Sequence, residues 1–121
     1  MLVDDDKMIV HFFKMLLEEN DYQVEATYSG FEAIEHAENH HIDLAILDYK
    51  LSDMTGDVLA KKLKDINEET IIIFITGYSE ARDKILRTNL SKHVVVKPIK
   101  DDELIATVEQ AFHDNSTVMR M

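Results

Sequence analysis

The chain has 121 residues, no cysteine, and a formal net charge of −11, with 24 acidic against 13 basic side chains. This length suits one globular domain with a core of ordinary size, and the missing cysteines exclude disulfides and thiolate chemistry. The acidic surface disfavours direct nucleic-acid binding, because a phosphate backbone would repel it. The sequence shows no membrane-spanning apolar run and no signal peptide, so we expect a cytoplasmic protein without membrane contact.

Five short apolar runs alternate with five amphipathic stretches, which is the order expected of a parallel sheet covered by helices on both faces. The expected strands are residues 2–3, 22–28, 44–47, 71–75 and 94–96. The runs IIIFI and VVV are β-branched and do not alternate with polar residues, so both are expected in or near the sheet interior. YQVEATY does alternate, which favours an edge strand.

The helices are expected between the strands. In the first, residues 7–20, apolar side chains recur every three or four positions and include Phe12. Asp6 and Ser29 are the expected N-caps of the first two helices. Later helices are expected to begin near residues 57, 79 and 101. Three histidines at 36, 40 and 41 are interpreted as an exposed polar helix end rather than a metal site.

Polar side chains follow four of the five expected strands. Asp4 and Asp5 follow the first, Asp48 the third, Thr76 the fourth and Lys97 the fifth. In an open parallel sheet, ligands bind beyond these carboxyl ends, so the side chains should converge on one site. Carboxylates from two strands suit Mg²⁺, and an ammonium with a hydroxyl suits a phosphoryl group. Asp48, which leaves an interior strand, is the candidate nucleophile for an acyl phosphate.

The order and spacing of these residues resemble the receiver domain of response regulators in two-component signalling. Asp48 follows Asp5 by 43 residues, Thr76 follows after 28 more and Lys97 after a further 21, and the resemblance spans essentially the whole chain. It implies an α/β, flavodoxin-like three-layer sandwich: a five-stranded parallel sheet in order 2-1-3-4-5 with five helices. That order makes the fifth strand an edge. It also implies a cis peptide bond between Lys97 and Pro98.

The resemblance further implies roles for individual residues. Asp48 would accept a phosphoryl group from a phosphohistidine of a sensor histidine kinase or phosphotransfer protein. Mg²⁺ would be bound by Asp5 directly, by Asp4 through water, by Asp48, and by the backbone carbonyl of Lys50. Thr76 and Lys97 would contact the phosphoryl group. Such a domain promotes only its own phosphorylation and dephosphorylation, and is a signalling module rather than an enzyme.

The sequence departs from the family pattern at one switch position. Val94 stands three residues before the lysine, where the family usually has Tyr or Phe, and a valine cannot report phosphorylation by swinging a ring. Tyr78 and His93 are the candidate substitutes. Gly77, after the fourth strand, and Gly56, which ends the polar loop after Asp48, are glycines for which a functional role is considered.

Two other functions stay open. A magnesium-dependent phosphohydrolase that uses an aspartyl phosphate would need an acid two residues after its nucleophile, where Lys50 stands. A phosphorylation-independent adaptor with a receiver fold is favoured by Val94 and disfavoured by the intact site. The face formed by the fourth helix, fifth strand and fifth helix is the expected surface for partners or a homodimer, with Ile99 and Leu104 as candidate contacts.

The limits of the domain are also expectations. Residues 1–113 are assigned to the receiver domain and residues 114–121 to a loose C-terminal tail or linker stub. Strands average about 5–6 residues, but only Met1, Leu2 and Val3 precede the acidic run. We therefore expect the native chain to begin several residues earlier.

Overall fold

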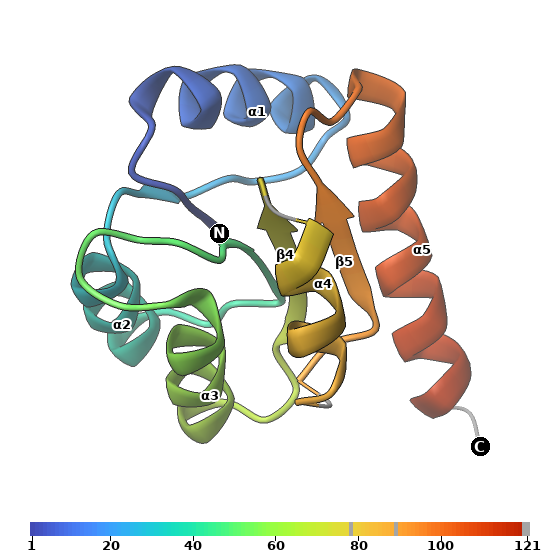
Figure 1. Ribbon diagram of the computed structural model, residues 1–121. Coiled ribbons are helices and arrows are strands. Elements are labelled where there is room, and N and C mark those ends of the chain that lie inside the picture. The colour runs from blue at the N-terminus through green and yellow to red at the C-terminus, as the bar shows by residue number, and fades with distance from the viewer. Residues whose placement is uncertain (78, 89, 120–121) are drawn as a thin grey trace.

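The sheet has the topology that the sequence and the resemblance led us to expect. The computed structural model describes residues 1–77, 79–88 and 90–119 (Figure 1). It contains five parallel strands in the order β2-β1-β3-β4-β5. Their bounds are β1 Leu2–Val3, β2 Ala26–Thr27, β3 Leu44–Asp48, β4 Ile71–Thr76 and β5 His93–Val96. The edge positions of β2 and β5 are therefore confirmed.

Five helices cover this sheet in two layers. Their bounds are α1 Lys7–Glu19, α2 Gly30–Asn39, α3 Gly56–Ile66, α4 Ser79–Leu86 and α5 Asp101–Met119. One buried cluster joins α1 and α5 to one face of the sheet, and a second joins α2, α3 and α4 to the other face. Successive residues of β4 alternate between the clusters, with Ile73 in one and Phe74 in the other. The three-layer sandwich is thus built on strands buried on both faces.

The strand β2 is shorter than the sequence pattern indicated. Only Ala26 and Thr27 pair with β1, opposite Leu2 and Val3. The segment 22–25 follows Asp21, which adopts φ = 69°, a conformation that Asp tolerates better than most residues. Just ahead of the strand, the Glu25 carbonyl accepts a hydrogen bond from Leu2 N–H at 2.8 Å, so contact with β1 begins one residue before Ala26.

Both expected N-caps are present. The Asp6 carboxylate accepts hydrogen bonds from the backbone N–H groups of Met8 at 3.0 Å and Ile9 at 3.3 Å. The Ser29 hydroxyl accepts one from Glu32 N–H at 3.2 Å, and the Glu32 carboxylate accepts from Tyr28 N–H at 2.9 Å. Side-chain oxygens thereby satisfy N–H groups that the first turns of α1 and α2 cannot pair internally.

Two expectations about buried side chains were wrong. Phe12 is 45% exposed, because the face of α1 that meets the sheet is centred on Val10, Phe13 and Leu17. Leu104 is fully buried in the core, so it cannot contribute to a docking face. The sequence of an amphipathic helix shows that it has an apolar face, but packing against the sheet decides which residues lie at the centre of that face.

The C-terminal helix is longer than expected. Residues 114–121 were expected to form a loose tail, but α5 continues through Met119, and residues 120–121 lie outside the described residues. Near this end, the His93 imidazole of β5 lies 3.3 Å from the Asp114 carboxylate. The division between domain and tail after residue 113 stays a prediction. No helix within the described ranges has both the length and the apolar character needed to cross a membrane.

The Asp6 cap gives a first prediction. Asp6→Ala should lower the free energy of unfolding by about 1 kcal/mol, because two N–H groups of α1 lose their acceptor. Asp6→Ser keeps an oxygen acceptor and should recover most of that loss. Urea unfolding monitored by circular dichroism measures both variants, and equal stability of the alanine variant and the parent would refute the capping role.

Candidate functional site

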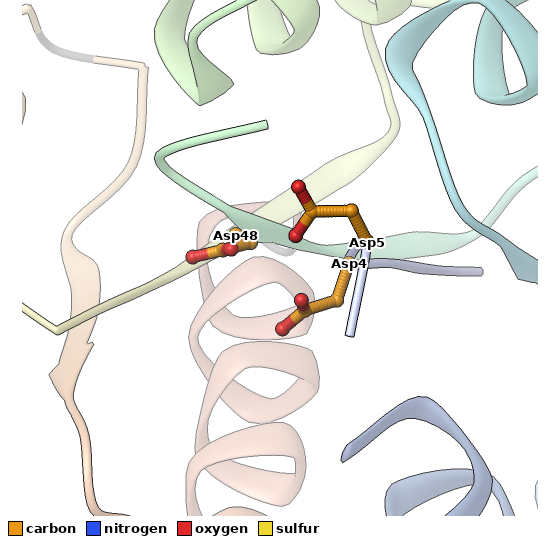
Figure 2. Close-up of side chains that lie close together, drawn as sticks. All are labelled: Asp4, Asp5 and Asp48. Carbon is orange, nitrogen blue, oxygen red and sulfur yellow. The ribbon is translucent and has the colours of Figure 1, made fainter. Parts of the chain in front are cut away.

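Three carboxylates converge where β1 and β3 end. Asp48 is the last residue of β3, and Asp4 and Asp5 follow β1 directly. Oxygen atoms of the three side chains lie within 4.8 Å of one another (Figure 2). The strand register produces this proximity, because β1 and β3 are parallel neighbours with Val3 opposite Leu47. The expected convergence of these three residues is therefore observed.

Lys97 supplies the cation that faces this cluster. Its ammonium group donates a hydrogen bond to Asp4 at 3.1 Å and lies 3.6 Å from Asp48. Its backbone N–H donates to the carbonyl of Thr76 at 2.7 Å, which fixes the start of the segment after β5 against the end of β4. Thr76 is itself buried, at 1% exposure. The five side chains expected at the site thus lie at the carboxyl ends of four adjacent strands.

Asp4 and Asp5 occupy different environments. Asp4 is buried, and its carboxylate accepts hydrogen bonds from Asp6 N–H at 2.9 Å and from Lys97. Asp5 is exposed. The more buried carboxylate is therefore held by donors of the protein, whereas the exposed one lies at the mouth of the site.

The electrostatics of the cluster are unbalanced, since one ammonium group faces three carboxylates. Burial, together with the negative charges of Asp4 and Asp5, raises the pKa of Asp48 to about 6, although Lys97 opposes the shift. Burial by itself disfavours the charge on Lys97, but its hydrogen bond to Asp4 and the charges of Asp4 and Asp48 raise its pKa above the usual value. At neutral pH both groups are therefore charged.

Backbone hydrogen bonds connect the two sides of the loop that follows Asp48. Gly56 N–H donates to the Tyr49 carbonyl at 2.6 Å, and Leu51 N–H donates to the Met54 carbonyl at 3.2 Å. A Cβ atom on Gly56 would lie 2.7 Å from the backbone oxygen of Asp48, closer than real Cβ contacts allow. Glycine at this position therefore lets α3 begin directly against the backbone of the candidate nucleophile.

Asp53 fastens the same loop to α2. Its carboxylate accepts hydrogen bonds from the backbone N–H groups of Gly30 and Phe31, both at 2.9 Å. Slight burial opposes its charge, but these bonds hold the pKa of Asp53 below its usual value. Gly30 also packs closely on Met54, because an added Cβ would clash with the methionine sulfur. The sequence did not reveal the role of Asp53, because no local pattern links it to Gly30 and Phe31, which lie 23 and 22 residues earlier in the chain.

The remaining site expectations have mixed outcomes. The Lys97–Pro98 peptide bond is cis, as expected. Lys50 forms an isolated bridge with Thr55 across the loop, and the role of its carbonyl stays a prediction. Gly77 is exposed and a Cβ there would meet nothing within 4 Å, so the described structure gives no steric reason for glycine.

At the switch position, Val94 packs against the core where the family usually has an aromatic ring. Val94 is half-buried, lies opposite Phe74 in the sheet and packs on the cluster under α2, α3 and α4. His93 points to α5, where it meets Asp114. Tyr78, the other candidate substitute, lies outside the described residues.

The three histidines lie at the C-terminal end of α2 and directly after it. Within the described part of the chain, the aspartate cluster is the group of acidic or histidine side chains close enough to share an ion. The rings of His36 and His40 stack at 4.2 Å, and His41 lies 2.9 Å from the exposed Asp43 carboxylate. This agrees with a polar helix end.

Comparison with known proteins decides the family. Residues 1–109 match the family described as response regulator receiver domain. The chain belongs to this family. As a receiver domain it is a signalling module of two-component systems, and the fold and the resemblance stated from its motifs are confirmed.

Relatives and solved structures agree with this assignment. The receiver domain is 29% identical over 119 residues to the transcriptional regulatory protein DltR of Streptococcus agalactiae, covering 98% of this chain and 53% of that protein. A CheY-like receiver domain protein of Methanospirillum hungatei is 27% identical, with a TM-score of 0.88 over 96% of this chain and 94% of that one. The response regulator TrrA of Thermotoga maritima, solved in complex with Mg²⁺ and BeF, is 29% identical, with a TM-score of 0.83 over 91% and 95% of the two chains.

The receiver domain spans about half the length of the curated relatives it matches. The response regulator ArlR of Staphylococcus aureus, 29% identical over 109 residues, is likewise covered over 49% of its length and 89% of this chain. The activity of those whole proteins is therefore not transferred to this domain.

The pKa of Asp48 predicts how stability depends on pH. The folded value, about 6, lies above the ordinary 3.8, so the native state holds the proton more tightly than the unfolded chain. The stability that Asp48 contributes is present below about pH 4 and is lost as pH rises through 6. In metal-free buffer at pH 7, Asp48→Asn should raise the free energy of unfolding by up to about 3 kcal/mol.

Urea unfolding with a chelator at pH 4, 5, 6, 7 and 8 measures this difference. The gain should grow between about pH 4 and 6 and then stay constant. Asp65→Asn, which neutralises an exposed carboxylate of α3, is the matched control and should change stability little. An asparagine variant no more stable than the parent at pH 7 would contradict the repulsion described.

Asp53 gives a separate prediction about the loop. Asp53→Ala removes the acceptor for two N–H groups and should lower the free energy of unfolding by about 1 kcal/mol. The same variant should also speed amide hydrogen exchange at Gly30 and Phe31. Asp53→Asn keeps one oxygen acceptor, so its stability and its exchange rates should lie between those of the parent and those of the alanine variant. Unchanged exchange at both amides in the alanine variant would show that the contact is not formed in solution.

Proposed function

We propose that this receiver domain accepts a phosphoryl group on Asp48 from a phosphohistidine, in a magnesium-dependent reaction that switches partner binding. The observation that carries the proposal is the placement of Asp48 at the end of an interior strand, 3.6 Å from the Lys97 ammonium and beside two further carboxylates. The donor would be a sensor histidine kinase or a phosphotransfer protein.

The side chains support a simple transfer. A carboxylate oxygen of Asp48 attacks phosphorus, the P–N bond of the phosphohistidine breaks, and the leaving imidazole nitrogen keeps the electron pair. Because the pKa of Asp48 is about 6, the nucleophile is ionised at neutral pH without a separate base. Lys97, held between Asp4 and Asp48, offsets the negative charge of the incoming phosphoryl oxygens. The Thr76 hydroxyl, at the end of the adjacent β4, is assigned to the same group.

The donor set fits a magnesium ion. Mg²⁺ prefers oxygen ligands and commonly binds through one or two carboxylates while keeping several waters. Asp5, Asp48 and the Lys50 carbonyl would bind it directly and Asp4 through water. When bound, the ion neutralises the carboxylate cluster and the phosphoryl charge. The solved relative in complex with Mg²⁺ and BeF supports this assignment.

The alternative functions are less well supported. A phosphohydrolase of the aspartyl-phosphate type would need an acid where Lys50 stands, and the family match is to receiver domains. An adaptor that ignores phosphorylation is favoured only by the valine at the switch position, whose half-buried side chain packs on the core. The α4–β5–α5 face stays the proposed surface for partners or a homodimer, with Ile99 but not Leu104 available to it, and the cytoplasm the proposed location.

Phosphorylation by a small acyl phosphate tests the proposal directly. With Mg²⁺, intact-mass spectrometry should show one added phosphoryl group on the parent and none on Asp48→Asn. Omission of Mg²⁺ should slow labelling by at least about tenfold, since the repulsion at the cluster is then not neutralised.

Asp65→Asn should be labelled like the parent, and serves as a folded control of equal charge change. Labelling of the Asp48→Asn variant, or no labelling of the parent, would overturn the assignment of Asp48.

A further inference from the structure

The loop between β3 and α3, residues 49–55, carries the Lys50 carbonyl that the proposed function assigns to the metal ion. Its two ends are fixed, because Tyr49 N–H donates to the Ile75 carbonyl of β4 at 2.9 Å and Gly56 N–H donates to the Tyr49 carbonyl at 2.6 Å. The tip of the loop lies away from these ends and reaches the start of α2 (Figure 1). Because Lys50 lies between a fixed end and the tip, the position of its carbonyl depends on how both are held.

Asp53 holds the tip through both oxygens of its carboxylate. One oxygen accepts a hydrogen bond from Gly30 N–H and the other from Phe31 N–H, both at 2.9 Å. These are the first two N–H groups of α2, which a helix cannot pair internally, and the positive end of the helix dipole lies beside them. The tip is thus attached to a helix by a pair of charge-assisted hydrogen bonds.

The start of α2 is also attached to the other side of the metal site. Thr27 and Tyr28 lead into α2, and the Thr27 carbonyl accepts a hydrogen bond from Asp4 N–H at 3.3 Å. The Lys7 ammonium lies 5.6 Å from the centre of the Tyr28 ring, in a cation–π contact. The segment 27–31 therefore bridges the two parts of the chain that carry the assigned ligands, which are the loop after β1 and the loop after β3.

A magnesium ion requires precisely placed ligands. It binds in near-ideal octahedral geometry with short ligand distances of about 2.0–2.1 Å, so a displaced carbonyl is a poor ligand. A loop that is already held in place also loses little conformational freedom when an ion binds, whereas ordering a loose loop lowers the affinity. Contacts that fix the tip therefore raise the affinity for the ion without touching it.

We propose that Asp53 is a positioning residue of the metal site: by fastening the tip of the loop to α2, it holds the Lys50 carbonyl where it can bind Mg²⁺ beside the carboxylates. This inference rests on the proposed function, because it takes the magnesium ligands from there. Coupling between two sites is reciprocal, so an ion bound at the cluster also strengthens the hydrogen bonds of Asp53 to the start of α2.

Isothermal titration calorimetry with MgCl₂ alone measures the affinity without any phosphoryl transfer. Asp53→Ala should raise the dissociation constant for Mg²⁺ by at least about fivefold. Asp53→Asn loses the same charge but keeps one oxygen acceptor, so its dissociation constant should lie between those of the parent and the alanine variant. Asp65→Asn, which loses an equal charge at an exposed position of α3, should bind like the parent, and circular dichroism checks that every variant is folded.

Amide hydrogen exchange measures the reciprocal effect in the parent chain. Saturating Mg²⁺ should slow exchange at Gly30 and Phe31 by about the same factor by which Asp53→Ala weakens ion binding. Glu32 N–H, which bonds to the Ser29 hydroxyl in the same turn, is the internal control and should change less. A purely structural contact would protect the two amides equally with and without the ion.

Labelling by a small acyl phosphate separates this inference from the proposed function. In Asp53→Ala, the Mg²⁺ concentration that gives half of the maximal labelling rate should rise at least about fivefold, whereas the rate at saturating Mg²⁺ should fall less than about twofold. A parent chain that binds no Mg²⁺ and is not labelled would overturn both proposals. A labelled parent, with an Asp53→Ala variant of equal Mg²⁺ affinity, would overturn the positioning role alone.

Two further outcomes would overturn the positioning role. One is an Asp53→Asn variant that binds Mg²⁺ as weakly as Asp53→Ala, which would assign the loss of affinity to the missing charge rather than to the hydrogen bonds. The other is amide exchange at Gly30 and Phe31 that saturating Mg²⁺ leaves unchanged.

Discussion

The repulsion among Asp4, Asp5 and Asp48 is the constraint around which this domain is arranged. Three carboxylates stay within 4.8 Å of one another because parallel pairing fixes where β1 and β3 end. That pairing is in turn held by an apolar core, in which β3 and most of β4 are buried on both faces. The scaffold thus concentrates negative charge at one edge, and Lys97 offsets only part of it.

Much of the site follows from local sequence signals. The parallel fold makes the carboxyl ends of neighbouring strands meet, so Asp5, Asp48, Thr76 and Lys97 could be brought together from their positions after apolar runs. The N-caps Asp6 and Ser29 could also be predicted from the sequence, because an N-cap side chain bonds to backbone N–H groups within three residues of itself.

The features that sequence did not reveal depend on contacts between distant segments. Asp53 meets the first turn of α2 across more than twenty residues, and the pairing of Ala26 and Thr27 with β1 joins segments that are equally far apart in the sequence. Phe12 and Leu104 were misplaced for a related reason, since their exposure depends on how a helix rotates against the sheet. The amino-acid composition of a segment limits which side chains can be buried, but packing against other segments decides which of them are.

The loop that follows Asp48 has a consequence for tolerance to change. Exposed loops usually accept insertions, yet this one is fastened at its ends, where Gly56 meets Tyr49, and near its middle, where Asp53 meets α2. Its length is therefore more constrained than its composition. Ser52 is exposed and takes part in neither contact, so we expect substitution there to be tolerated better than an inserted residue, which would lengthen the chain between the two anchors.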